Sequence, residues 1–373
     1  MHCQLLKKHY NSVAVYLQHT LKTESHIFID NDTEAENLKL PAGKIPSDVL
    51  QNVVFKHLGI KRKEVLLGPR VGEDGAIIEV GNKALITSMD PITGALERIG
   101  WLAVNVNAND IATFGIRPTF FSSCILLPEN GTPKTVETIS KQMGTAAKKL
   151  EIAIIGGHCE TTPGITHPIV VGSAMGVTEK NHYVTSGGAE PGNSIILTKG
   201  VGIEGTAILA SDKQELLKKR FKLSFLKKAA SFFDRISVVE DAVLAFETGG
   251  VTAMHDPTEG GVAGGIHEIA DASNVGVKVL EAKIPIHEET LEICKFFKID
   301  SLQLISSGAL LIAAKKDFAE RIVETLKDRG IEAAIVGEFL KTPEKRVLVG
   351  KDGVKKSLVR PLSDHLWKAL KQE

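Results

Sequence analysis

The sequence of 373 residues is poor in the features that mark several common classes of protein. Aromatic residues make up only 5% of it, which leaves little surface for stacking against nucleic-acid bases. Lys and Arg together number 45, and so do Asp and Glu, so there is no excess of charge to attract nucleic acid or an anionic membrane. We therefore expect neither nucleic acid nor a membrane among its partners.

Cysteine is also scarce, and long apolar runs are absent from the sequence. The four cysteines, at positions 3, 124, 159 and 294, form no CxxC pair, which argues against a structural zinc site or a disulfide framework. No apolar run reaches the roughly 20 residues that a membrane-spanning helix needs. These absences predict a cytoplasmic protein whose thiols stay reduced.

The chain is long enough, and at 43% hydrophobic apolar enough, to build more than one core. We predict a loosely ordered extension at 1–37, an N-terminal domain at 38–180, a C-terminal α/β domain at 190–349, and a tail with a helix at 350–373. A loop rich in Gly and Pro at 187–192 separates the two domains.

Helical and strand patterns alternate along most of the chain, which predicts helices layered on sheets. Strands are expected at 76–80, 84–89, 120–127, 152–155, 169–177, 194–198, 251–254, 277–280, 309–313 and 333–336. Helices are expected at 46–58, 99–106, 133–150, from 204, within 213–248, from 261 to 273, at 288–298 and at 317–329.

Acidic and amide side chains occur at three points between apolar segments of the first domain. Asp74 lies in Gly-Glu-Asp-Gly-Ala, Asp90 ends a predicted strand, and Asn109 and Asp110 follow the predicted helix 99–106. Each has an ordinary alternative: a turn, a strand end and a helix cap, respectively. Because Mg²⁺ bridging to phosphate oxygens would satisfy several carboxylates at once, the set predicts a nucleotide-phosphate site.

Three further glycine-containing segments could let the backbone approach a phosphate. Residues 156–160 read Gly-Gly-His-Cys-Glu, where Glu160 is the candidate metal ligand or substrate-positioning residue and Cys159 is expected to be a small buried residue. Residues 198–202 read Thr-Lys-Gly-Val-Gly, without the order of a Walker A loop; a plain strand-to-helix turn is the alternative. Residues 255–261, His-Asp-Pro-Thr-Glu-Gly-Gly, are the clearest candidate, with a solvated capping loop as the alternative.

In this order, these segments resemble those of the aminoimidazole ribonucleotide (AIR) synthase superfamily, and within it the HypE-like hydrogenase maturation proteins. The match spans about residues 40–349. The resemblance implies an α+β fold of two α/β domains, in which the N-terminal domain forms a β-barrel across a homodimer and the C-terminal domain is layered. It also implies ATP and Mg²⁺ as cofactors, and a reaction in which ATP phosphorylates a carbonyl or amide oxygen.

The residues and the resemblance together nominate a site. Asp74, Asp90 and Asp110 are the expected metal ligands, and Glu160 and Asp256 are the expected catalytic residues. The residues expected to contact the nucleotide are Gly72, Asp74, Gly75, Asn107, Asn109, Gly156, Gly157, Gly200, Gly202, Gly260 and Gly261.

One departure from the HypE-like pattern concerns the substrate. HypE-like proteins carry the carboxamide on a C-terminal cysteine, whereas the last cysteine here is Cys294. We therefore predict an ATP-dependent phosphoryl-activating synthetase or dehydratase, a HypE-like hydrogenase maturation factor, with metal-centre maturation proteins as partners and a carboxamide or other small molecule as second substrate. The alternatives are a small-molecule kinase resembling thiamine-monophosphate kinase, and a non-catalytic ATP-binding partner in metal-centre assembly.

Overall fold

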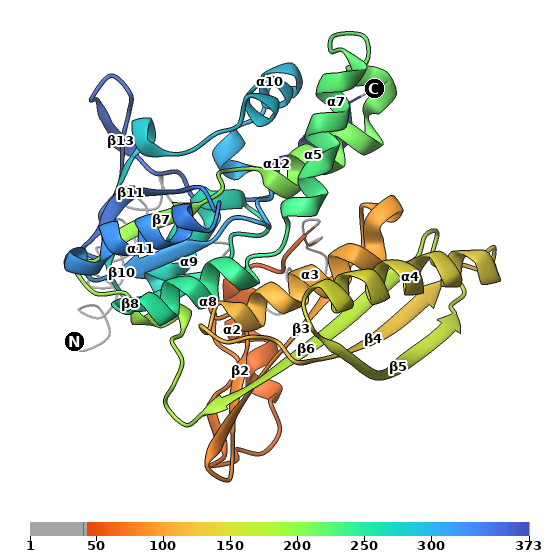
Figure 1. Cartoon of the computed structure of the whole chain (residues 1–373), viewed down its shortest axis with the longest axis horizontal. Coiled ribbons are helices and arrows are strands. Elements are labelled where there is room, and N and C mark those ends of the chain that lie inside the picture. The colour runs from red at the N-terminus through yellow and green to blue at the C-terminus, as the bar shows by residue number, and fades with distance from the viewer. Residues whose placement is uncertain (1–39, 41–42, 373) are drawn as a thin grey trace, which may run out of the picture. The chain divides into compact units, whose positions relative to one another are not determined.

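The computed structural model describes residue 40 and residues 43–372, so the predicted extension at 1–37 lies outside the described residues. Two β-sheets organise the described chain (Figure 1). The first contains β1 (Val65–Leu67), β2 (Ala76–Val80), β3 (Lys83–Ile92), β6 (Ile169–Glu179), β4 (Phe120–Leu127) and β5 (Ala153–Thr161), in that spatial order. All neighbours are antiparallel except β4 and β5.

Two helices, α3 (Ile99–Ala112) and α4 (Pro133–Lys149), cover one face of this sheet (Figure 1). Every residue of α3 is buried, because the helix contacts the strands on one side and α4 on another. At the start of α4, Pro133 occupies the first turn and the Thr132 side chain accepts a hydrogen bond from the Thr135 amide at 3.3 Å.

The second sheet has the order β13 (Lys355–Ser357), β12 (Arg346–Val349), β9 (Gly276–Leu280), β11 (Ala333–Leu340), β7 (Ser194–Thr198), β10 (Leu311–Ala314) and β8 (Val251–His255). Its two faces follow the alternation of side chains along a strand. Ile196 and Ile312 join the core that contains α8 (Val239–Thr248) and α11 (Lys316–Asp328), whereas Ile195 and Leu197 join the core under α9 (Gly261–Ala272). Helices therefore cover both faces of this sheet (Figure 1).

The remaining helices pack at the edges of these layers. They are α2 (Ser47–Asn52), α5 (Ile203–Asp212), α6 (Gln214–Leu217), α7 (Leu223–Ala230), α10 (Glu288–Phe297) and α12 (His365–Leu370). In the described part of the chain, every helix falls short of the length or the hydropathy that a bilayer span requires. Among the residues that the structure describes, neither sheet closes on itself, so the barrel across a dimer stays a prediction.

Two helices and two strands show the clearest errors among the predicted element boundaries. The helix predicted at 46–58 ends at Asn52, after which a 3₁₀ turn (Val54–His57) begins. The helix predicted at 99–106 continues to Ala112, because residues beyond 106 are also buried, so Asn109 and Asp110 lie inside it and do not cap a later turn.

The two strand errors have a common cause, since each strand continues along its neighbour. Asp90 lies inside β3, which pairs with β6 up to Ile92. Pro91 fits there because the pairing with β2 stops at Thr87, leaving one side of β3 without a neighbouring strand. Gly156 and Gly157 are likewise interior to β5, which pairs with β4 as far as Thr161.

Candidate active site

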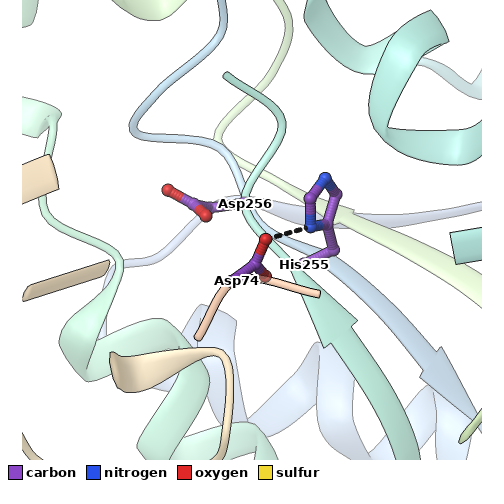
Figure 2. A group of neighbouring side chains, drawn as sticks. All are labelled: Asp74, His255 and Asp256. Atoms are coloured by element: carbon purple, nitrogen blue, oxygen red, sulfur yellow. Dashed lines mark ion pairs between the residues drawn. The ribbon is translucent and has the colours of Figure 1, made fainter. Parts of the chain in front are cut away.

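Three side chains from opposite parts of the sequence meet where the two sheets approach each other. Asp74 precedes β2, His255 ends β8, and Asp256 follows it; one ligand atom of each lies within 4.8 Å of the others (Figure 2). The Nδ1 of His255 lies 2.7 Å from Asp74 Oδ1, and its Nε2 lies 2.7 Å from Glu268 Oε2 on α9. The first of these contacts is an ion pair, and the second is also a hydrogen bond.

Two carboxylates favour the charged form of the His255 imidazole. Burial opposes the charge, but the carboxylates of Asp74 and Glu268 outweigh it and hold the pKa of His255 well above its ordinary value. Burial acts to raise the pKa of Glu268. The charges of Lys44 and His255 outweigh burial and hold that pKa below its ordinary value. His255 therefore links the loop before β2 to helix α9 through two ionic contacts.

Asp256 is the least satisfied polar side chain of the site. It is 1% exposed, and neither carboxylate oxygen has a hydrogen-bond partner among the described residues. Burial, followed by the charge of Asp74, raises the pKa of Asp256 well above its ordinary value. A buried carboxylate with two unpartnered oxygens is suited to bind a cation, since such groups are nearly always paired in proteins.

Asp90 and Asp110 join the same neighbourhood from β3 and α3. Ser88 Oγ donates to Asp110 Oδ2 at 2.6 Å, and the Asp90 amide donates to Asn107 Oδ1 at 2.8 Å. Burial is the largest cause that raises the pKa of Asp110, followed by the charges of Asp90, Asp256 and Asp74. The aspartates at 74, 90, 110 and 256 thus influence one another, and we call them the acidic cluster.

The segment that connects the two sheets also supports the site. The Ser186 amide donates to Glu73 Oε2 at 3.0 Å, and Ser186 Oγ lies 3.3 Å from Asp74 Oδ2 and 3.1 Å from the Met254 carbonyl. Sequence reasoning did not assign roles to His255, Glu268 or Ser186. The sequence did contain a signal for Glu268. Residues seven positions apart lie on a similar face of a helix, so Glu268 lies on the same side of α9 as Gly261, at the start of that helix.

Whether a divalent cation fits this site depends on which side-chain atoms are available to coordinate it. The acidic cluster offers carboxylate oxygens alone, which are the ligands that Mg²⁺ prefers, and the two oxygens of Asp256 are free to coordinate. His255 is already engaged by two carboxylates. Two surface hollows of about 260 and 350 Å³ lie elsewhere and contain none of the acidic cluster, so side-chain chemistry rather than concavity locates the site.

Several predicted site residues lie apart from the cluster or have other contacts. Glu160 is exposed on β5, where its carboxylate contacts His158 at 3.1 Å and Thr162 at 2.8 Å. Asn109 bridges two backbone groups instead: its Nδ2 donates to the Ile236 carbonyl and its Oδ1 accepts from the Val238 amide. The expectation that Cys159 is buried was wrong, because β5 is an edge strand whose residues are all exposed.

The glycines predicted to contact nucleotide are closely packed against protein, except Gly156 and Gly260. A Cβ at Gly72 would lie 2.9 Å from the Glu268 carbonyl oxygen, and one at Gly75 would lie 2.8 Å from that of Thr87. Amides at the other two loops already donate within the protein: Gly200 to Thr198, Gly202 to Ser306, Gly260 to Asp364 and Gly261 to Thr258. In this conformation those four amides are not free to bind a phosphate.

Both halves of the chain match family models. Residues 72–178 match the model described as AIR synthase related protein, N-terminal domain, and residues 190–350 match the corresponding C-terminal domain. A putative hydrogenase expression/formation protein of Methanocaldococcus jannaschii is 30% identical over 302 residues, spanning 79% of this chain and 88% of that protein. The carbamoyl dehydratase HypE of Rhizobium leguminosarum bv. viciae is 28% identical over 282 residues, 73% of this chain and 78% of that protein.

Solved structures share the fold. HypE in a HypE–HypF complex superposes with a TM-score of 0.71 at 23% identity, covering 84% of this chain and 99% of that one. HypE in complex with ATP superposes with a TM-score of 0.66 at 21% identity, covering 88% of this chain and 98% of that one. A thiamine monophosphate kinase from Aquifex aeolicus superposes with a TM-score of 0.62 at 18% identity, covering 83% of this chain and 97% of that one. At these identities the likeness concerns the fold alone.

Proposed function

The chain belongs to the family of AIR synthase related proteins, and from that premise we propose that it is a HypE-like hydrogenase maturation enzyme that uses Mg²⁺ and ATP to activate an amide oxygen. The observation that carries the proposal is the acidic cluster with the two unpartnered oxygens of buried Asp256. The relatives support the choice of substrate class, since one is named a carbamoyl dehydratase. The use of ATP is supported by the structurally similar HypE that was solved in complex with ATP.

In this proposal, Asp74, Asp90, Asp110 and Asp256 would hold Mg²⁺, which when bound neutralises charge on the phosphoryl oxygens. His255 keeps the Asp74 carboxylate in place through its ion pair, Ser88 holds the Asp110 carboxylate, and Asn107 holds the backbone of Asp90. Transfer of the γ-phosphoryl group to the amide oxygen releases ADP. Loss of that phosphate, with two protons leaving the nitrogen, then yields a nitrile.

The carboxamide could be carried by a partner or be a small molecule. The structurally similar HypE was solved in complex with HypF. On this basis we propose that a maturation protein is also a partner of this chain. The kinase alternative rests only on shared fold at low identity. It differs in outcome, because a kinase would leave a stable phosphorylated acceptor.

Binding and turnover assays test the proposed function. Equilibrium dialysis with labelled ATP is expected to show binding that depends on Mg²⁺. With an S-carbamoyl thiol as probe substrate, ADP and phosphate are expected to form together with a thiocyanate, detected by its infrared absorption. The proposal is wrong if ATP does not bind when Mg²⁺ is present, and a phosphorylated acceptor in place of a nitrile would support the kinase.

We also propose that the protein is a homodimer formed through the edge strand β5. All of β5 is exposed, and it presents Ile154 at 43% and Ile155 at 57% exposure. An exposed apolar edge strand is a template for pairing with another chain. Pairing there would also give Glu160, on the same strand, a place at an interface.

An Ile155→Lys variant tests the dimer, because a charge on the edge opposes strand pairing. Light scattering after size exclusion is expected to give the mass of two chains for the unmodified protein and of one chain for the variant. Val354→Lys is the control, since Val354 is 61% exposed outside β5. A monomeric unmodified protein, or a variant that stays dimeric, would contradict this interface.

A further inference from the structure

A strongly basic segment lies on the surface of the C-terminal half, although the chain as a whole is neutral. Residues 213–228 contain seven Lys or Arg and a single Glu, a net charge of +6. Because the chain has 45 basic and 45 acidic residues, the rest of the sequence carries a net charge of −6. We call residues 213–228 the basic segment; it contains α6, the turn that follows, and most of α7.

The basic segment is an ordered part of the fold. Backbone hydrogen bonds close its turn, in which the amides of Arg220 and Phe221 donate to the Leu217 carbonyl at 3.0 and 2.9 Å. Phe221 stacks on Phe225 with ring centroids 4.8 Å apart, and both rings pack against the core. The cations therefore occupy fixed backbone positions, which reduces the entropy that a partner must remove on binding.

Most cations of the basic segment are not neutralised within the described part of the protein. Lys218 forms an ion pair with Glu215 at 2.5 Å, and Lys228 forms one with Glu289 at 2.5 Å. Four other exposed cations have no ion pair among the described residues: Lys219, Arg220, Lys222 and Lys227. Like charges held this close repel one another, so carboxylates of a partner would relieve a cost that the free protein retains.

An exposed apolar side chain lies among these cations. Leu223, the first residue of α7, is 48% exposed. It follows Lys222 directly and lies one helical turn before Lys227, so that Leu223 and Lys227 are neighbours on the surface of α7. An apolar contact surrounded by polar and charged groups is the usual arrangement at a protein–protein interface.

These features favour a protein over other polyanions as the partner. The rings of Phe221 and Phe225 already stack on each other and pack against the core, whereas single-stranded nucleic acid binds to rings that are open to a base. Residues 213–228, all of which the structure describes, expose one large apolar side chain, Leu223, which is too little for insertion into a membrane. A second copy that used the same surface would bring two basic segments together.

We propose that the basic segment is a docking surface for an acidic stretch of a partner protein, with an apolar side chain of that stretch packed against Leu223. The exposed cations attract and orient the stretch, and the contact with Leu223 selects among acidic sequences. This inference goes beyond the ATP chemistry and does not depend on it, because it uses no residue of the acidic cluster.

Peptide binding tests the charged part of the surface. The probe is a short fluorescein-labelled peptide of glutamates with one central leucine, and fluorescence anisotropy measures its affinity. Combining Lys219→Glu, Arg220→Glu and Lys222→Glu is expected to weaken binding at least about tenfold, because each reversal replaces an attraction by a repulsion. The matched control makes the same change in net charge at other exposed positions and should alter the affinity less than about twofold. Its substitutions are Lys327→Glu, Arg329→Glu and Lys351→Glu.

A second pair of measurements tests the apolar contact. Leu223→Ser is expected to weaken binding of the leucine peptide about threefold and to leave binding of a matching peptide with a central serine unchanged. Equal losses for the two peptides, or no loss for either, would overturn the role of Leu223.

Other outcomes would overturn the docking surface as a whole. One is failure of the unmodified protein to bind the leucine peptide, and another is equal weakening in the control variant, which would mean that only net charge matters. A third is tighter binding of an oligouridylate RNA or of phosphatidylserine vesicles that the triple reversal at 219, 220 and 222 abolishes.

Circular dichroism and Mg²⁺-dependent ATP binding are measured on every variant, and both are expected to be unchanged. Peptide binding that follows these expectations in a protein that does not bind ATP would support the docking surface and count against the proposed function alone. Loss of peptide binding together with loss of the folded circular dichroism spectrum would be resolved by Lys219→Gln with Lys222→Gln. That milder variant is expected to fold and to bind the leucine peptide about threefold more weakly, and unchanged binding would contradict the proposal.

Discussion

Asp256→Asn is expected to lower Mg²⁺-dependent ATP turnover by at least about 10²-fold, the scale of loss when one preorganised electrostatic group is removed. The carboxylate is 1% exposed and its oxygens have no partner among the described residues, so its charge is available to a cation. The measurement is phosphate release under saturating ATP and Mg²⁺. Turnover within a few-fold of the unmodified protein would remove Asp256 from the proposed site.

The same variant should be more stable than the unmodified protein when metal is absent. Burial raises the pKa of Asp256 well above its ordinary value, which means that the ionised side chain destabilises the folded state at neutral pH. Asn removes that charge, so the melting temperature without metal should rise while the increase caused by added Mg²⁺ shrinks. Asp328→Asn, at the exposed end of α11, is the control and should change neither quantity. A variant that is simply misfolded would instead melt at a lower temperature.

Gly261→Ala is expected to destabilise the protein by about 3 kcal/mol or more, through backbone strain and a steric clash. Gly261 has φ +62°, and a Cβ there would lie 2.5 Å from the Leu304 carbonyl oxygen and 2.6 Å from that of Leu302. Since these are backbone atoms, relief requires movement of the whole segment or of the start of α9. Because α9 carries Glu268, that movement would also disturb the contact between Glu268 and His255.

Denaturant unfolding measures this effect. Gly144→Ala is the matched control, because Gly144 lies inside α4 and a Cβ there would meet nothing within 4 Å. That substitution should stabilise the protein by up to about 1 kcal/mol, the difference in helix propensity between the two residues. Equal stability of the Gly261→Ala variant and the unmodified protein would show that the loop adapts without strain.

The sequence located most elements because the signals for them are local. The hairpin of β2 and β3 follows from two apolar runs around Gly-Asn-Lys, and the Thr132 to Pro133 start of α4 follows from capping preferences. The predicted strand ends were wrong where pairing with a neighbouring strand continues. β3 pairs with β6 beyond Asp90, and β5 pairs with β4 beyond Gly157. A strand end depends on its partner, which local periodicity does not contain.

Sequence alone determined the oxygen-rich positions at 74, 90, 110 and 256, and the resemblance of their order to a known family. Tertiary structure decided that these positions lie close together, and added His255 and Glu268 beside them. It also separated Glu160 and Asn109, whose side chains have other partners. The reason is physical: composition and spacing report which side chains carry charge, whereas the energy of a buried charge depends on what folding places beside it.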